Sequence, residues 1–127
     1  MRRRKPVLTG NELEIMQIVW RRKTATVRDV YEELRAGRKV AYTTVMTMMG
    51  ILEDKGFLKK SRRTKAYVYQ PSQPKSKVVG SMVKDFVERV FEGSATPLLV
   101  HLVENDQISP RELDEITRLL RERKGES

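Results

Sequence analysis

Cysteine is absent from the 127 residues, and histidine occurs once, at position 101. The missing thiols exclude structural disulfides, thiolate metal sites and cysteine nucleophiles. The sequence also has no Cys/His pair, no glycine-rich phosphate loop and no pair of carboxylates placed for acid–base chemistry. We therefore expect neither an enzyme nor a bound metal or cofactor. His101, with Glu104 one helical turn later, is interpreted as a packing or surface residue, because a closed metal site needs more ligands.

Long hydrophobic runs are also missing. No stretch approaches the roughly 18 consecutive apolar residues of a membrane span, and no signal-peptide core is present. We expect a cytoplasmic protein without membrane insertion, although the lack of cysteine does not itself fix the compartment.

Acidic residues are scarce in only one half of the chain. Residues 1–70 hold 17 Lys/Arg against 7 Asp/Glu, a balance of +10, whereas residues 71–127 hold 9 against 10, a balance of −1. The whole net charge of +9 therefore comes from the first half. Such a one-sided basic footprint favours a polyanion partner. A membrane surface would also fit the charge, but the helices carry apolar stripes without a matching lysine-rich face.

Residues 42–58 have the pattern of a DNA recognition helix. At 100° per residue, one side is apolar and carries Val45, Met48, Met49 and Leu52. The other side is short and uncharged, with Thr43, Met46, Thr47 and Gly50. Such a slender face can approach a major groove, where threonine can hydrogen-bond a base edge and touch the thymine methyl group. We assign base readout to Thr43, Thr44 and Thr47, with Met46 as an apolar contact; the alternative is a surface helix that lacks charge.

The residues before this helix predict two further helices. Thr9 and Glu12 form a capping-box pattern before an apolar stripe that ends near Arg22, in which Trp20 is expected to anchor the core. Thr26 is the predicted cap of a second helix that ends at Gly37. Their spacing fits a helix-turn-helix with a longer turn.

A β-hairpin is predicted after Gly56, which is expected to end the recognition helix. Residues 57–61 and 66–70 read as paired strands, and Arg62, Arg63 and Lys65 form a basic tip between them. Helix-turn-helix followed by a hairpin is the winged-helix order. The tip would then lie along phosphates, or it is simply a solvated loop.

Four further residues are candidates for contacts to the DNA backbone. Tyr42 and Thr26 lie near predicted helix N-termini, which favour phosphate, and Arg28 and Arg38 are within reach of the same region. The arm Arg2–Lys5 either touches phosphates or a minor groove, or it is a disordered tail.

The segment Pro71–Pro74 predicts a boundary between a winged helix-turn-helix domain at residues 1–72 and a helical domain at residues 73–127. The second domain should contain helices over Lys75–Phe91, from Thr96-Pro97, and from Ser109-Pro110. About 50 residues cannot bury enough apolar surface alone, so we expect a homodimer; the alternative is packing onto the winged domain. The predicted dimerisation residues are Val79, Met82, Val83, Phe86, Val87, Val90, Leu98, Leu99, Leu102, Leu113, Ile116, Leu119 and Leu120.

Several of these runs resemble the penicillinase-repressor (BlaI/MecI) family of bacterial transcription repressors. They are residues 8–20, the run Ala41-Tyr42-Thr43-Thr44-Val45-Met46-Thr47, and Lys55-Gly56-Phe57-Leu58. The resemblance covers about residues 8–123. It implies a homodimer that binds a pseudo-palindromic double-stranded DNA operator and blocks transcription of genes for β-lactam resistance, copper handling or other stress.

The resemblance also implies release by proteolysis in the dimerisation domain, carried out by a membrane sensor-protease. The corresponding position is His101-Leu102, where the family has Asn-Phe. The copper-responsive branch has a cysteine-rich motif, which this chain lacks. The alternative functions are a ligand-sensing winged-helix regulator, or a winged-helix module that binds RNA or protein.

Overall fold

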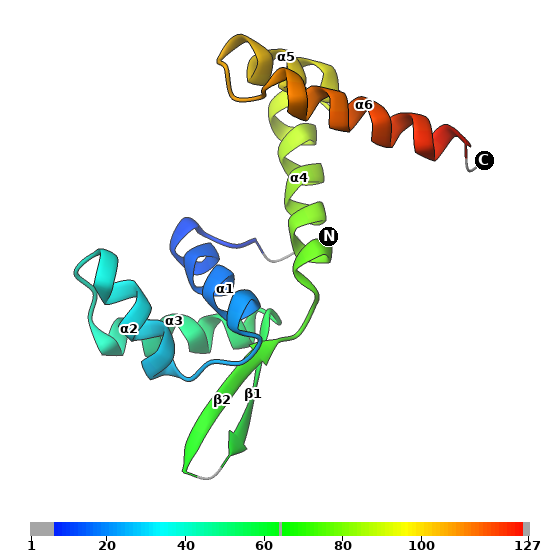
Figure 1. The fold of residues 1–127 in the computed structure, drawn as a ribbon. Helices are drawn as coiled ribbons and strands as arrows, with labels where there is room; N and C mark the ends of the chain where they lie inside the picture. Colours follow the sequence, from blue (N-terminus) through cyan, green and yellow to red (C-terminus); the bar gives the residue numbers. More distant parts are fainter. Residues whose placement is uncertain (1–6, 64, 126–127) are drawn as a thin grey trace, which may run out of the picture. The chain divides into compact units, whose positions relative to one another are not determined.

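The computed structural model describes residues 7–63 and 65–125, so the basic arm at residues 2–5 lies outside the described residues. The elements in chain order are α1 (Gly10–Arg22), α2 (Val27–Gly37), α3 (Tyr42–Asp54), β1 (Leu58–Arg63), β2 (Ala66–Pro71), α4 (Lys75–Phe91), α5 (Ala95–Glu104) and α6 (Pro110–Gly125) (Figure 1). This mainly helical chain with a two-stranded antiparallel hairpin confirms the predicted fold class. Within the described residues, no helix is both long and apolar enough to cross a membrane.

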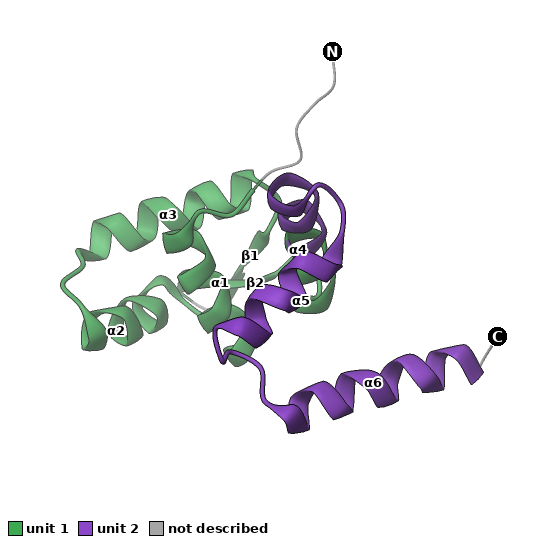
Figure 2. Ribbon diagram, turned by 90° about the horizontal axis from the view of Figure 1, so that it is seen from above, with its two compact units in different colours: residues 1–82 green, residues 83–127 purple. Residues whose placement is uncertain are grey.

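The chain divides into two compact units, residues 1–82 and 83–127 (Figure 2). The division falls inside α4, because Val78 in its first turn is buried in the core of the first unit and Met82 packs partly against that core. Helix α4 itself begins at Lys75, as the sequence predicted. The domain boundary between residues 72 and 73 stays a prediction.

Helices α1 and α2 both begin with reciprocal side-chain caps. The Thr9 hydroxyl accepts from the Glu12 N–H at 3.2 Å, and the Thr9 N–H donates to Glu12 Oε1 at 2.9 Å. Thr26 and Asp29 repeat this arrangement at 3.1 and 2.9 Å. Each box satisfies two backbone donors that an open helix end would leave without partners. Asp29 therefore fixes, together with Thr26, where α2 starts.

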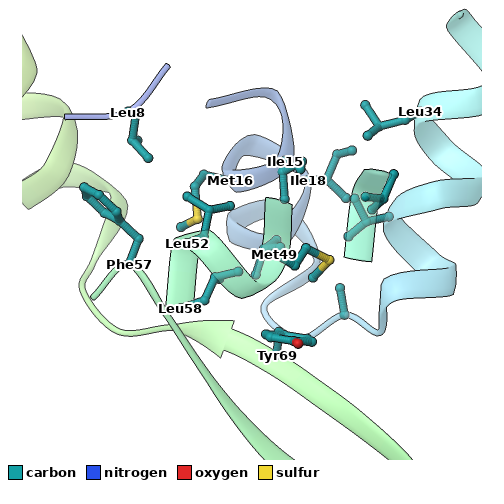
Figure 3. Packing of buried hydrophobic residues seen from close by; sticks show 14 of the residues in the cluster. Leu8, Ile15, Met16, Ile18, Leu34, Met49, Leu52, Phe57, Leu58 and Tyr69 are labelled. Carbon is teal, nitrogen blue, oxygen red and sulfur yellow. The ribbon is translucent and has the colours of Figure 1, made fainter. Parts of the chain in front are cut away.

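The core of the first unit lies between α1, α2, α3 and the base of the hairpin (Figure 3). Its largest fully buried side chains are Ile15, Met16, Val19, Val30, Val45, Met49, Leu52 and Leu58. Burying each such side chain contributes about 1.5–3 kcal/mol relative to exposure. Trp20 packs half-buried against this core, and its Nε1 has no hydrogen-bond partner among the described residues.

Gly56 ends α3 and turns the chain into the hairpin. Its φ of 87° lies in the left-handed region, which glycine adopts without a Cβ penalty. The Gly56 N–H donates to the Glu53 carbonyl at 3.0 Å, and the Phe57 N–H donates to the Leu52 carbonyl at 2.9 Å. These two bonds form a Schellman motif, and they confirm the predicted helix end.

The hairpin is tied directly to the helical core. Strands β1 and β2 pair from Leu58 opposite Pro71 to Arg63 opposite Ala66. Tyr69 also pairs with Ala25, between α1 and α2, through two backbone hydrogen bonds of 2.8 and 2.9 Å. Arg62 and Arg63 therefore lie in β1, whereas the sequence placed them in the tip. The reason is that cross-strand pairing continues to Arg63 and leaves only two residues in the connection.

In the second unit, α6 starts where the sequence predicted, and α5 starts one residue earlier than predicted. Helix α6 starts after Ser109, as predicted, and Ser109 caps it: the Ser109 N–H donates to Glu112 Oε1 at 3.0 Å, and the Glu112 N–H donates to the Ser109 hydroxyl at 3.1 Å. Helix α5 begins at Ala95, one residue before Thr96, with Ser94 as its N-cap. Pro97 is therefore the third residue of that helix, a position where its missing N–H leaves no helical bond unmade.

One ion pair joins the start of α1 to the end of α3. Lys55 Nζ lies 2.8 and 3.0 Å from the two oxygens of Glu12, a carboxylate that is 5% exposed. Lys55 Nζ also donates to the Val7 carbonyl at 3.1 Å. Burial by itself would raise the pKa of Glu12, but the hydrogen bonds from Lys55 and Thr9 lower this pKa below its ordinary value of 4.5. Folding therefore favours the ionised carboxylate.

Replacing Glu12 should change how stability depends on pH. Because the folded-state pKa is lowered, the ionised carboxylate contributes its full stability above pH 4.5 and loses it as pH falls through the folded value. Glu12→Gln should reduce the free energy of unfolding at neutral pH by about 1–3 kcal/mol. It should also reduce the amount of stability that is lost as the pH falls. Urea unfolding at a series of pH values measures both effects. Glu14→Gln, in an exposed pair with Arg38, is the control and should change stability by at most about 1 kcal/mol. Identical pH profiles for Glu12→Gln and the unmodified chain would contradict this account.

Candidate nucleic-acid interface

Helix α3 divides into a buried side and an outward side, as its sequence predicted. Val45, Met49 and Leu52 are 0% exposed. Thr43, Thr44 and Thr47 are exposed, and Met46 is 48% exposed. The four residues predicted to read bases therefore share the solvent-facing side of a helix that the core holds from behind. The face carries hydroxyls and methyl groups without charge, which is the chemistry that base edges can meet.

The N-terminus of α3 is open to an external acceptor. Its N-cap is Ala41, which supplies no side-chain hydrogen bond, so the first backbone donors are not capped as they are in α1 and α2. Free N–H groups at a helix N-terminus attract phosphate through hydrogen bonding and the helix dipole. Tyr42 is the first helical residue and is 37% exposed.

Aromatic and charged side chains from α2 surround Tyr42. The Arg28 guanidinium lies 5.5 Å from the centre of the Tyr42 ring. Tyr31 meets Tyr42 edge to face, with 5.4 Å between ring centres and 76° between planes. The sequence pattern selected Arg28 and Tyr42 but missed Tyr31, because α2 and α3 come together only in the folded chain.

Thr26 and Arg38 already have partners within the protein. The Thr26 hydroxyl accepts the Asp29 N–H, so the hydroxyl hydrogen is what it can offer to phosphate. Arg38 Nη2 lies 2.9 Å from Glu14 Oε1 on α1. A phosphate would have to compete with this ion pair for Arg38.

The hairpin presents a basic face that includes Lys60 and Tyr67, two residues that the sequence pattern did not select. Lys60 and Arg62 lie two residues apart on β1, so they share one face. The Tyr67 ring, 50% exposed on β2, has Lys60 Nζ 4.7 Å and the Arg62 guanidinium 5.8 Å from its centre. Arg63 and Lys65 are also exposed. The alternation of Lys60 with Arg62 was visible in the sequence, but the cross-strand position of Tyr67 depends on the register.

The second unit exposes an unusual amount of apolar surface. No side chain between residues 83 and 125 is classed as buried. Val83, Phe86 and Val90 on α4 are 48–56% exposed, and Leu119 and Leu120 on α6 are 55% and 60% exposed. Leu99 and Leu113 are 39% and 41% exposed, whereas Val87, Leu98, Leu102 and Ile116 are half-buried. Of the remaining predicted dimerisation residues, Val79 and Met82 lie in the first unit and are half-buried.

The predicted cleavage position lies within a regular helix. His101 and Leu102 are in the last part of α5, and the His101 carbonyl accepts from both the Asn105 N–H and the Asn105 side-chain amide, at 3.1 and 2.8 Å. The His101 ring lies 5.9 Å from that of Phe91. Among residues 7–63 and 65–125, no group of three or more His, Cys, Asp or Glu side chains could hold a metal ion.

Comparison with known proteins identifies relatives along nearly the whole chain. The family model described as penicillinase repressor matches residues 8–122. The chain is 28% identical to the penicillinase repressor of Bacillus licheniformis over 120 residues, which cover 94% of each protein. It is 36% identical to the transcriptional regulator BlaI of Mycobacterium tuberculosis over 113 residues, covering 87% of this chain and 80% of that one. It is 26% identical to the methicillin resistance regulatory protein MecI of Mammaliicoccus sciuri, covering 89% and 92%.

Two solved structures of a relative are each similar to more than half of the chain. One is the monomeric form of Bacillus licheniformis BlaI in complex with a half-operator, with a TM-score of 0.51 and 27% identity, covering 57% of this chain and 89% of that one. The other is the DNA-binding domain of the repressor BlaI, with a TM-score of 0.52 and 27% identity, covering 59% and 92%.

Two methionines on α3 offer a matched test of its two faces. Met49→Ala should lower the free energy of unfolding by about 2–5 kcal/mol, because it leaves a cavity in the core. Met46→Ala removes the same atoms from a side chain that is 48% exposed and should change stability by less than about 0.5 kcal/mol. Chemical denaturation of both variants measures the difference. Equal losses would mean that α3 is not partitioned as described.

Proposed function

Since this chain belongs to the penicillinase repressor family of DNA-binding transcriptional repressors, we propose that it binds a pseudo-palindromic operator as a homodimer. The chain is a DNA-binding transcriptional repressor and not an enzyme. The observation that carries the proposal further is the uncharged outward side of α3, with the basic hairpin following it in the same unit. We propose a cytoplasmic site of action.

Base readout is assigned to Thr43, Thr44, Met46 and Thr47. Their side chains are exposed on α3 while the opposite side of the helix is fixed in the core, so they would enter a major groove on a rigid support. Threonine hydroxyls can donate or accept, and the Met46 side chain can contact a thymine methyl group. A relative, BlaI, has been solved in complex with a half-operator, which supports DNA binding by a similar unit.

Phosphate contacts are assigned to the hairpin and to the corner between α2 and α3. Arg62, Arg63 and Lys65 supply positive charge on the hairpin, to which the structure adds Lys60. Tyr42, Arg28 and Thr26 would contact the backbone near the open end of α3. Such contacts fix the position of the protein on a duplex without reading sequence. A wing used for protein contacts would be expected to expose apolar residues instead of these cations.

The homodimer is supported by the apolar surface of the second unit. Exposed valine, leucine and phenylalanine side chains on α4, α5 and α6 form more apolar surface than a small helical unit can hide. A second copy of the same surface would cover it with twofold symmetry. Two recognition helices would then contact two half-sites. Tethering the two winged units in this way would raise the affinity by about 10²–10⁴ over that of one unit.

Release from the operator is proposed to occur through cleavage at His101–Leu102 by a membrane sensor-protease. The cut would separate Leu98 and Leu99 from Leu102 and α6, and it would divide the apolar surface of the proposed dimer. Because the His101 carbonyl is hydrogen-bonded within α5, the last turn must open before a protease can bind it in extended form. The names of two relatives refer to penicillinase and to methicillin resistance, so β-lactam resistance genes are the first targets to examine.

Base and phosphate contacts should separate on mutation. Thr47→Ala should weaken binding to a selected operator by about 1 kcal/mol or more, with a smaller effect on random duplex DNA. Arg63→Ala should weaken binding to both kinds of DNA about equally and reduce the salt dependence of binding by about one phosphate contact. Fluorescence anisotropy at several salt concentrations measures affinity and slope together. The assignment is wrong if the two substitutions act alike on operator and random DNA.

The dimer surface should be sensitive to charge on one side of α4. Phe86→Glu would place a carboxylate in the apolar stripe and should shift the chain toward a monomer in analytical ultracentrifugation. Ser81→Glu introduces the same charge on the opposite side of α4 and is the matched control; it should leave the dimer intact. Operator affinity should fall for Phe86→Glu by about 10²–10⁴ through lost bivalency. A Phe86→Glu chain that still sediments as a dimer would place the interface elsewhere.

A further inference from the structure

Five side chains form a closed cluster where α2 meets the start of α3; we call it the corner cluster. The Arg28 guanidinium lies over the Tyr42 ring, 5.5 Å from its centre, and the Tyr42 and Tyr31 ring centres are 5.4 Å apart. The Arg35 guanidinium lies 5.7 Å from the centre of the Tyr31 ring. Glu32 completes the cluster, since its Oε1 is 3.4 Å from Arg28 Nη1 and 3.6 Å from Arg35 Nη1. Every member therefore contacts two others.

Helix spacing explains the arrangement. Arg28 and Glu32, and Tyr31 and Arg35, are each four residues apart on α2, so the four side chains share one face. Tyr31 is half-buried and packs against the core, while the other members are exposed. Tyr31 is thus the one member whose position is set by the interior of the protein.

The cluster solves a local problem at the start of α3. Because Ala41 provides no side-chain cap, no hydrogen bond from the N-cap side chain orders the first turn that carries Tyr42. An edge-to-face contact with a ring held in the core restricts the Tyr42 side chain. The Tyr42 ring lies beneath the Arg28 guanidinium, and beside the contact of Arg28 Nη1 with Glu32 the guanidinium has further N–H donors for an external acceptor.

We propose that Tyr31 is a positioning residue for DNA binding: it holds Tyr42, and through Tyr42 it holds Arg28 in place for a backbone phosphate beside the reading face of α3. The inference rests on the proposed DNA contacts of this unit. Glu32 is shared between Arg28 and Arg35, so the cluster keeps a net positive charge and Arg28 is not fully neutralised. Tyr31 itself makes no contact with DNA in this account.

The test is a double-mutant cycle between Tyr31→Leu and Arg28→Gln in the full-length chain. The readout is the slope of log K against log salt for a short random-sequence duplex, which requires no knowledge of the operator. Arg28→Gln should reduce the steepness of the slope by about 0.9, the value for one phosphate contact. Tyr31→Leu should reduce the steepness by a similar amount. The slope of the double variant should equal that of Arg28→Gln alone.

Two further variants separate positioning from simple stability. Tyr31→Phe keeps the ring and should restore the slope of the unmodified chain. Tyr42→Leu breaks the cluster from its exposed side and should reproduce the effect of Tyr31→Leu, so the inference remains testable if Tyr31→Leu does not fold. Circular dichroism confirms that the compared variants are equally folded.

The outcomes distinguish this inference from the proposed function. If the unmodified chain shows no salt-dependent binding to duplex DNA, the DNA contacts themselves are wrong. If it binds but the Tyr31 and Arg28 effects simply add, or if the folded Tyr31→Leu or Tyr42→Leu chain keeps the original slope, Tyr31 does not act through Arg28. An unchanged slope for Arg28→Gln also overturns the inference, because Arg28 then has no phosphate to meet.

Discussion

Helix α3 supplies part of the core on one side and, in the proposed function, the surface that reads bases on the other, and the rest of the first unit follows from that constraint. The helix can present Thr43 and Thr47 to a partner only while Val45, Met49 and Leu52 remain in the interior. A surface that reads bases needs a fixed position, and here the fixed position comes from close packing against α1, α2 and β1. Stability and the proposed recognition of DNA would therefore depend on the same thirteen-residue helix.

Contacts at both ends of α3 hold it in place against its neighbours. At its C-terminus, the Schellman turn at Gly56 directs the chain into β1, and Lys55 forms an ion pair with Glu12 at the start of α1. At its N-terminus, Ala41 supplies no capping side chain, and the Tyr31 ring of α2 contacts the Tyr42 ring instead. The hairpin is attached separately, through the Ala25–Tyr69 bridge. Of these contacts, the Glu12–Lys55 ion pair and the Ala25–Tyr69 bridge join segments that are distant in sequence.

The second unit differs from the first in how far its side chains are buried within a single chain. The first unit has a core with side chains at 0% exposure, while no side chain in the described part of the second unit is classed as buried. Helices whose apolar stripes stay exposed gain little from the hydrophobic effect. We expect α4, α5 and α6 to obtain their stability from association, and a switch that divides α5 would then act on assembly and leave the reading helix untouched.

Local rules in the sequence determined the starts of α1, α2 and α6 and the two faces of α3. Threonine caps with Glu12 and Asp29, Gly56 at a helix end, and the 3.6-residue period of Val45, Met49 and Leu52 each act within a few residues, so they can be read without a structure. The sequence also predicted a basic hairpin, although it placed Arg62 and Arg63 in the tip and not in β1. Only the tertiary structure decided which distant side chains meet. Glu12 and Lys55 are 43 residues apart in the chain, Tyr67 faces Lys60 and Arg62 through strand register, and Tyr31 reaches Tyr42 across the turn between α2 and α3. Local periodicity sets which way a side chain points, but packing of the whole unit sets what it meets.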